Sequence, residues 1–354
     1  MKLIHCADIH LGSRLDSRFS PAVARQRRLE VRNTFRRMVE YARQQQIPGI
    51  LLCGDVFDSE RPFKEDKTFF YSVVRSNPEI SFFYLRGNHD CRDSGREDPP
   101  ANLKTFSESW TSYILGDAAI SGIELTGENA LSLYSAFAPV PGKRNIVMLH
   151  GQTASAPAPG CICLSRLRGK GIDYLALGHI HSHSSGILEG GTLWCYSGCL
   201  EGRGYDETGE KGFVVLDTEN LERVQFVPFS GRVIHRLTVD LTGTADSYEA
   251  YRRVLEQPLP GEEDLLHLTL TGELNYHSED LASDLSRYLE GRFFHLRLKD
   301  RTLPAFDALA HRGDVSLRGE FIRTVLSCPD YTRQEQQQIL ELGLKALSGR
   351  EVAL

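Results

Sequence analysis

Five short apolar runs dominate the first two thirds of the chain, and each one ends in residues that favour metal ions. The runs are rich in Ile, Val, Leu and Phe, and they cover residues 2–6, 50–53, 81–85, 145–149 and 173–177. Each is short enough to be a strand that is buried on both faces. A helical pattern of apolar residues occupies residues 21–46, between the first two runs. Strands that alternate with helices in this way predict an α/β fold.

Polar groups follow the five runs at once and form the candidate site. They are Asp8-Ile9-His10, Gly54-Asp55-Val56-Phe57-Asp58, Gly87-Asn88-His89-Asp90, His150-Gly151 and Gly178-His179-Ile180-His181. Ligand sites of open α/β sheets lie beyond the carboxyl ends of the strands, so the five groups are expected to converge. Carboxylates and imidazoles can hold two divalent ions about 3.5–4 Å apart, with one shared Asp that sets their separation. The ordered set therefore predicts a two-metal centre.

The length and composition of the chain limit the classes of protein to which it can belong. With 354 residues, 41 % of them hydrophobic, the chain is long enough for about two globular domains. No apolar run reaches the roughly 18 residues of a membrane span, and the first residues lack the apolar core of a signal peptide. A cytoplasmic protein without a membrane partner is expected.

The formal net charge of -6 argues mildly against non-specific binding of nucleic acid, but its distribution is uneven. Residues 14–43 contain nine arginines against three acidic residues, a local charge of +6. This stretch is either a phosphate-contacting surface that includes Arg14 and Arg18, or a solvated helix face. On charge alone the two interpretations are equal.

Cysteine spacing raises a zinc alternative. The pairs Cys161-x-Cys163 and Cys195-x3-Cys199 are tight for one ion and have no nearby histidines that complete a typical zinc motif. Reduced, partly buried thiols are the better expectation.

The pattern changes around residue 232. Apolar residues alternate over residues 237–241, 266–270 and 294–298, and helical patterns occupy residues 247–256 and 278–289, which predicts a small unit with one solvated sheet face. Thr332 and Glu335 have the spacing of a capping box that starts a last helix with a wide apolar face. The predicted domains are 1–231, 232–314 and 315–354. The last helix either packs on its own domain or docks on another chain.

The polar groups resemble those of the calcineurin-type metallophosphoesterases, which implies a four-layered α/β/β/α sandwich with two central sheets. More narrowly, the chain resembles the bacterial SbcD/YhaO-type DNA repair exonucleases, relatives of the double-strand-break repair nuclease of archaea and eukaryotes. The narrower resemblance depends on His10-Leu11-Gly12, on residues 54–58, on residues 196–201 with Glu207, and on Lys211-Gly212-Phe213. It also depends on the layout of a small α+β cap domain followed by C-terminal helices. The motifs cover about residues 1–216.

By this resemblance, seven side chains would hold two divalent ions, with Asp55 shared. One ion would lie among Asp8, His10, Asp55 and His181, and the other among Asp55, Asn88, His150 and His179. His89 would act beside the phosphate without binding metal, and Asp90 would orient His89 by a hydrogen bond. Two interpretations of Asp58 are equal. It either contacts the substrate, or it caps a helix or holds a metal-binding residue in place. Mn²⁺ is preferred because the set has O and N donors but no thiolate, while Mg²⁺, Fe²⁺ and Zn²⁺ remain open.

The resemblance implies a manganese-dependent exonuclease that hydrolyses phosphodiester bonds at DNA ends in DNA repair, together with an SMC-like ATPase subunit. Single-strand endonuclease activity is a further expectation, and a homodimer is compatible with the pattern. Two alternatives stay open: a phosphodiesterase or phosphatase of small molecules such as cyclic nucleotides, and a DNA-end-binding scaffold with a weak metal site. The cap region speaks against the first alternative, and the complete set of metal-binding residues speaks against the second.

Overall fold

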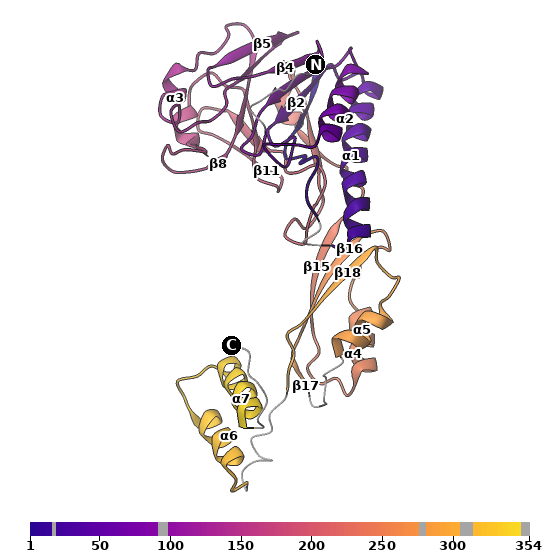
Figure 1. Ribbon diagram of the computed structural model, residues 1–354. Coiled ribbons are helices and arrows are strands. Elements are labelled where there is room, and N and C mark those ends of the chain that lie inside the picture. Colours follow the sequence, from indigo (N-terminus) through magenta and orange to yellow (C-terminus); the bar gives the residue numbers. More distant parts are fainter. Residues whose placement is uncertain (16–18, 91–97, 275, 277–280, 305–313, 348–354) are drawn as a thin grey trace. The chain divides into compact units, whose positions relative to one another are not determined.

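The chain divides into two compact units, Met1–Ile234 and His235–Leu354. The computed structural model describes residues 1–15, 19–90, 98–274, 276, 281–304 and 314–347 (Figure 1). The first unit contains all five apolar runs and their polar ends. The three-part division at residues 231 and 314 remains a proposal.

Two six-stranded sheets form the centre of the first unit. The first has the order β14-β13-β1-β2-β3-β4, in which β1 (Lys2–Cys6), β2 (Gly49–Cys53), β3 (Ser81–Leu85) and β4 (Leu103–Thr105) are parallel. β13 (Gly212–Asp217) pairs antiparallel with β1 and with β14 (Gln225–Pro228). The second has the order β11-β12-β10-β7-β6-β5. Its strands are β5 (Thr111–Leu115), β6 (Ala118–Gly122), β7 (Arg144–His150), β10 (Tyr174–Gly178), β11 (Ser184–Ile187) and β12 (Leu193–Tyr196). The five predicted runs are therefore β1, β2, β3, β7 and β10.

Three apolar clusters separate the layers of this unit. Helices α1 (Pro21–Gln44) and α2 (Lys64–Arg75) cover the outer face of the first sheet, where Phe35 and Phe70 pack with Ile4 and Ile50 (Figure 1). Between the two sheets, side chains of β1, β2 and β3 pack against β7 and β10. The short helix α3 (Leu133–Ala136) and the turn η1 (Leu164–Leu167) cover the other face of the second sheet. The predicted α/β/β/α sandwich is confirmed.

Short elements fill the connections of the first unit. They are the two-stranded pair β8 (Gln152–Thr153) and β9 (Cys161–Ile162), and the turn η2 (Leu221–Arg223). The four cysteines of the suggested zinc pairs are free thiols, and no metal-type cluster of the described residues includes a cysteine. Of these four, Cys163, Cys195 and Cys199 are buried and Cys161 is half-buried.

The second unit contains a three-stranded sheet in the order β15-β16-β18, made of β15 (Ile234–Asp240), β16 (Leu265–Thr271) and β18 (His295–Asp300). Helices α4 (Ser247–Leu255) and α5 (Leu281–Tyr288) pack on one face of it through Val254, Leu285 and the leucines of β16. These elements match the predicted pattern, except that residues 278–280 of the expected second helix lie outside the described residues. A small parallel pair joins β17 (Glu273–Leu274) and β19 (Leu303–Pro304).

Two helices, α6 (Leu317–Ser327) and α7 (Arg333–Leu347), form a hairpin at the end of the described chain. The predicted capping box is confirmed, since Thr332 N donates to Glu335 Oε2 at 2.8 Å and Glu335 N donates to Thr332 Oγ1 at 3.3 Å. The apolar face of α7 is divided: Leu340 is buried against α6, whereas Leu342 and Leu347 are 41 % and 46 % exposed. Among the described residues, no helix combines the length and the apolar character that a bilayer span requires.

Candidate metal centre

The carboxyl ends of five strands from both sheets meet at one place and bring the polar groups together. Asp8 and His10 follow β1, Asp55 follows β2, Asn88 follows β3, His150 ends β7, and His179 and His181 follow β10. Two groups result, in each of which the potential ligand atoms lie within 4.8 Å of one another. The first group is Asp8, His10 and His181, and the second is Asp55, His150 and His179. The predicted convergence is therefore observed, although the five strands belong to two sheets.

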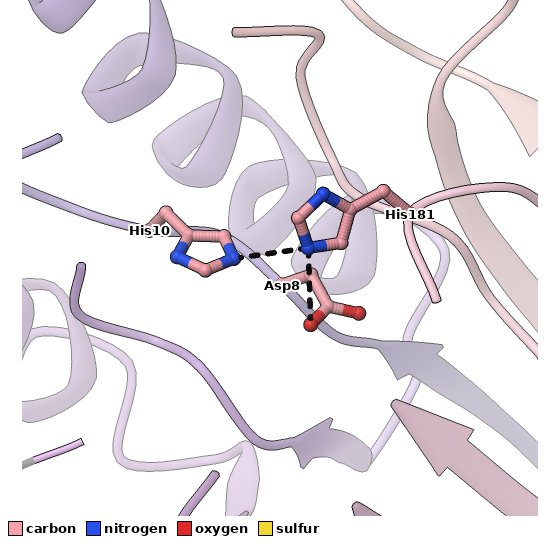
Figure 2. A group of neighbouring side chains, drawn as sticks. All are labelled: Asp8, His10 and His181. Carbon is pink, nitrogen blue, oxygen red and sulfur yellow. Dashed lines mark hydrogen bonds and ion pairs between the residues drawn. The ribbon is translucent and has the colours of Figure 1, made fainter. Parts of the chain in front are cut away.

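Two imidazole nitrogens face each other in the first group. His10 Nε2 lies 3.2 Å from His181 Nε2, which lies 3.8 Å from Asp8 Oδ1 (Figure 2). The Nδ1 of His181 is 2.7 Å from Glu207 Oε1, a carboxylate oxygen that accepts hydrogen bonds but donates none, and 3.2 Å from Arg203 Nη2. Burial lowers the pKa of His10 to about 4, so its ring is neutral at pH 7. With the proton of each ring on Nδ1, two Nε2 lone pairs point at the same spot, which fits a cation.

The second group surrounds one nitrogen with oxygens. His150 Nε2 lies 3.3 Å from Asp55 Oδ2 and 3.1 Å from Asn88 Oδ1, while His150 Nδ1 lies 2.8 Å from the carbonyl oxygen of Cys53. Burial alone would lower the pKa of His150, but Asp55 raises it to about 9. Without a metal, the ring therefore keeps a proton on both nitrogens. A divalent ion at Nε2 would replace one of these protons, so this group also fits a cation.

Asn88 and Asp55 connect the members of the centre. Asn88 Oδ1 also lies 3.1 Å from His179 Nδ1. Asp55 Oδ2 is 3.9 Å from His10 Nε2, so the same oxygen that contacts His150 also approaches the first group. One carboxylate oxygen of Asp55 therefore approaches a histidine of each group.

The backbone holds these side chains in place at a cost. Asp8, His10 and Asp55 have a φ of 52°, and His179 has a φ of 100°, a region that non-glycine residues rarely adopt. Hydrogen bonds between the loops stabilise this conformation: Asp8 N donates to the Gly54 carbonyl at 3.0 Å, and His10 N donates to the Asp55 carbonyl at 2.9 Å. At Gly54, with a φ of 90°, a Cβ atom would lie 2.1 Å from His150 Nδ1, so the glycine is required.

His89 and Asp90 do not interact as the sequence predicts. The backbone N–H of His89 donates to Asp55 Oδ1 at 2.9 Å, and its exposed ring lies edge-to-face with the ring of His10 at 5.3 Å. Asp90 is buried, and its carboxylate accepts hydrogen bonds from the backbone N–H groups of Phe57 at 2.8 Å and Gly87 at 2.9 Å. Among the contacts of the described residues, none joins Asp90 to the His89 ring. Asp90 instead ties the loops after β2 and β3 together.

The predicted substrate contacts differ in their environment. Asp58 Oδ1 accepts a hydrogen bond from Arg203 at 2.7 Å and lies 3.0 Å from His10 Nδ1. These contacts favour the supporting role of Asp58. Arg14 is exposed and lines a cavity of about 550 Å³ together with Arg25 and Arg28. Arg18 lies outside the described residues.

The basic stretch of residues 14–43 is not one uniform surface. Arg27 is fully buried and paired with Glu201 and Glu30, and Arg32 is paired with Asp66. These two arginines stabilise the packing of α1, and the exposed ones, such as Arg14, are those that can reach a phosphate.

Arg203 is not among the site residues predicted from the sequence. Glu207 was named there only as part of a motif and was given no role. Arg203 donates to both Asp58 and Glu207, and Lys211 Nζ donates to the carbonyl oxygen of His181 at 2.9 Å. Arg203, Glu207 and Lys211 lie in the loop before β13 and are buried, with Arg203 9 % exposed. The density of charged residues in this glycine-rich loop, 201–211, is the signal that could have found them.

The second group opens into a polar cavity of about 810 Å³, lined by Asn88, His150, His179, Arg61 and Arg86 among others. Residues 1–183, more than half of the chain, match the family model described as calcineurin-like phosphoesterase. The chain belongs to this family. It is a metal-dependent phosphoesterase, and the calcineurin-like fold implies two divalent metal ions, which the two groups of side chains fit.

Three curated relatives narrow the comparison. The DNA double-strand break repair protein Mre11 of Sulfurisphaera tokodaii is 26 % identical over 77 % of this chain and 74 % of its own length. A metallophosphoesterase named YhaO from Bacillus subtilis is 29 % identical over 62 % of this phosphoesterase and 58 % of its own length. One component of the nuclease SbcCD of Rhodobacter capsulatus is 31 % identical over 25 % of this chain and 22 % of its own length. The phosphoesterase is thus similar to proteins named for nuclease activity and DNA repair.

Proposed function

We propose that this phosphoesterase is a manganese-dependent DNA exonuclease that acts on DNA ends in double-strand-break repair. The observation that carries the proposal is the pair of neighbouring metal-type groups, both approached by Asp55 Oδ2, of which the second opens into a polar cavity large enough for a nucleotide. The names of the relatives from Sulfurisphaera tokodaii and Rhodobacter capsulatus support the choice of DNA over other phosphate esters.

Seven side chains would hold the two ions: Asp8, His10, Asp55, Asn88, His150, His179 and His181. The ions supply Lewis-acid chemistry, in which the pKa of a water falls and the charge of the phosphodiester is neutralised. Mn²⁺ suits this set because every donor is an oxygen or an imidazole nitrogen. The nearby thiols do not compete, since burial raises the pKa of Cys53 and Cys199 well above the usual value.

The chain's own residues have distinct tasks in this proposal. Asp55 sets the separation of the two groups, because its Oδ2 atom approaches both. Asn88 orients His150 and His179 from the cavity side. His89, whose ring is exposed beside His10, lies where it can give a proton to the departing 3′ or 5′ oxygen of the sugar.

A basic sheet face in the second unit supports nucleic acid as the substrate. Leu266, Leu268 and Leu270 of β16 face the helices, and His267 lies on the opposite face beside Arg297 of β18. Burial first, and then the positive charges of the exposed Arg297, Arg236, Lys299 and Arg301, lower the pKa of His267. This cap sheet face therefore carries a positive potential that suits a phosphodiester backbone.

The C-terminal hairpin is the proposed docking site of an SMC-like ATPase subunit. Leu342 and Leu347 of α7 are exposed, as is Leu317 at the start of α6, so an apolar surface remains after the two helices have packed on each other. An amphipathic helix with such a surface fits the groove of another protein.

Release of nucleotides from end-labelled duplex DNA tests the proposal. The full chain is treated with EDTA, reloaded with Mn²⁺ and given either linear duplex or a cyclic nucleotide, with Asp55→Ala as the inactive control. Mn²⁺-dependent release of nucleotides from DNA ends is expected. Turnover of the cyclic nucleotide alone would instead identify a small-molecule phosphodiesterase. Tight binding of DNA ends without any turnover by the protein with two bound ions would identify a scaffold.

A further inference from the structure

Arg203 connects two carboxylates that lie far apart in the sequence. One nitrogen of its guanidinium donates to Asp58 Oδ1 at 2.7 Å, across 145 residues, and the other donates to Glu207 Oε1 at 2.8 Å. The backbone N–H of Arg203 also donates to Glu207 Oε2 at 2.7 Å. The arginine is nine-tenths buried, so its planar, two-sided donor set is fixed between the two acceptors.

Each of the two carboxylates lies behind one imidazole of the first metal group. Glu207 Oε1 is 2.7 Å from His181 Nδ1, and Asp58 Oδ1 is 3.0 Å from His10 Nδ1. The Nε2 atoms of these rings are the pair that face each other at 3.2 Å. A single guanidinium therefore stands behind both histidines of the first group and sets where their carboxylate partners lie.

The second group is supported differently. The Nδ1 of His150 is held by the backbone carbonyl of Cys53, at the end of β2, at 2.8 Å. His179 is fixed through its backbone N–H, which donates to Asp8 Oδ2 at 2.9 Å. In the second group, the Nδ1 of His150 thus faces a backbone carbonyl, whereas the Nδ1 atoms of both histidines of the first group face side-chain carboxylates. The histidines of the two groups therefore have different partners behind their rings.

We propose that Arg203 is a positioning residue for the first of the two metal ions: it fixes Asp58 and Glu207 behind His10 and His181 and leaves the second group unaffected. The inference rests on the proposed ligation of metal by these histidines. Without the guanidinium, Asp58, whose side chain is 23 % exposed, can turn toward water and leave His10 without its neighbour. Loss of such a partner costs about 10-fold to 100-fold in metal affinity.

Charge alone would act in the opposite direction, because removal of a cation near a metal site favours metal binding. Arg203→Lys separates the two effects, since it keeps the positive charge while one ammonium group cannot span both carboxylates. We expect Arg203→Lys to weaken one Mn²⁺ about 10-fold to 100-fold and to change the other less than about threefold. Arg203→Met, which also removes the charge, is expected to weaken the same ion.

The experiment is a titration of the metal-free full chain with Mn²⁺. Binding is monitored by calorimetry and by the electron paramagnetic resonance signal that two coupled Mn²⁺ ions give. Arg27→Lys is the matched control, because Arg27 is also buried between two carboxylates, Glu30 and Glu201, but contacts none of the proposed ligands. The Arg27→Lys variant is expected to have a lower thermal stability and to bind both ions as the unaltered chain does. Anomalous scattering from crystals of Arg203→Lys grown at limiting Mn²⁺ should place the remaining ion at Asp55, His150 and His179.

Each other outcome counts against the inference. Equal or tighter binding of both ions in Arg203→Lys would show that positioning by Arg203 does not matter. Equal weakening of both ions would show a general structural role. If Arg203→Met fails to fold, Glu207→Gln is measured beside Arg203→Lys. Glu207→Gln must then also weaken binding of the first ion and leave binding of the second unchanged. Failure of the unaltered chain to bind two ions would refute the metal ligation itself, which distinguishes the two hypotheses.

Discussion

Asp55 Oδ2 lies 3.3 Å from His150 Nε2 in the second metal group, and the same oxygen lies 3.9 Å from His10 Nε2 in the first. Asp55→Ala is therefore expected to weaken both Mn²⁺ ions by more than about 100-fold, beyond the effect of losing an indirect partner. Metal content after dialysis and calorimetry measures this. Asp66→Ala removes another buried aspartate, which pairs with Arg32, and should leave both ions in place. Retention of both ions in Asp55→Ala would exclude a bridging role.

His89→Ala should separate metal binding from turnover. The contact of His89 with Asp55 is made by its backbone N–H, which alanine keeps, whereas the ring is exposed beside His10. Both ions are expected to remain, while turnover of DNA falls about 10²-fold to 10⁴-fold, the usual contribution of a general acid. Metal content and rate of nucleotide release are measured on the same preparation. Unchanged turnover would mean that another group protonates the leaving oxygen.

The cap sheet face should govern affinity for DNA and its dependence on salt. The double variant Arg297→Ala and Lys299→Ala is expected to weaken binding of duplex ends and to reduce the slope of log K against log salt by about 1 to 2. Fluorescence anisotropy at several salt concentrations measures both quantities. Arg252→Ala with Arg287→Ala removes the same charge from exposed positions on α4 and α5 and should change the slope little. Equal effects of the two double variants would show that only net charge matters.

Stability should fall in mild acid because of His5. Its ring is fully buried and contacts Tyr174 Oη at 2.9 Å and the Leu177 carbonyl at 3.1 Å. Burial lowers its pKa to about 3, so the folded protein stays unprotonated there while the unfolded chain takes up a proton below about pH 6.5. The unfolded state therefore binds more protons between these values, and stability falls as the pH drops.

At pH 5 this group should cost about 2 kcal/mol relative to pH 7.5. Denaturant unfolding in EDTA at both pH values, with His5→Gln for comparison, measures the difference. The loss between pH 7.5 and pH 5 should be smaller in His5→Gln by that amount. Tyr174→Phe, which keeps the imidazole, should lower stability similarly at both pH values. The same pH dependence in His5→Gln and in the unaltered chain would contradict the assignment.

Local patterns predicted the strands and the direction of their polar ends. The run at residues 81–85 became β3 with the same bounds, because a short apolar segment between polar turns has few alternatives in a buried sheet. Asn88, His150 and His179 could be placed at one site because strand ends converge, a rule that needs no knowledge of side-chain packing.

Contacts between loops could not be predicted in the same way. Arg203 reaches Asp58 across 145 residues, and no periodic pattern marks which of several arginines in loops will be buried. Asp90 was expected to hold the His89 ring, but two loops that turn sharply toward each other leave unpaired backbone N–H groups, and the buried carboxylate satisfies those instead. Such details depend on how the two sheets pack, which the spacing of residues in one segment does not contain.

The left-handed backbone at Asp8, His10, Asp55 and His179 bears on how this chain can change over generations. Glycine would relieve about 1 kcal/mol or more of backbone strain at each of these positions. The present side chains therefore lower the stability of the folded protein. A duplicated copy that no longer needed metal ions would drift toward glycine or asparagine there. Inactive descendants should therefore be recognisable from four positions in their sequences, before any assay.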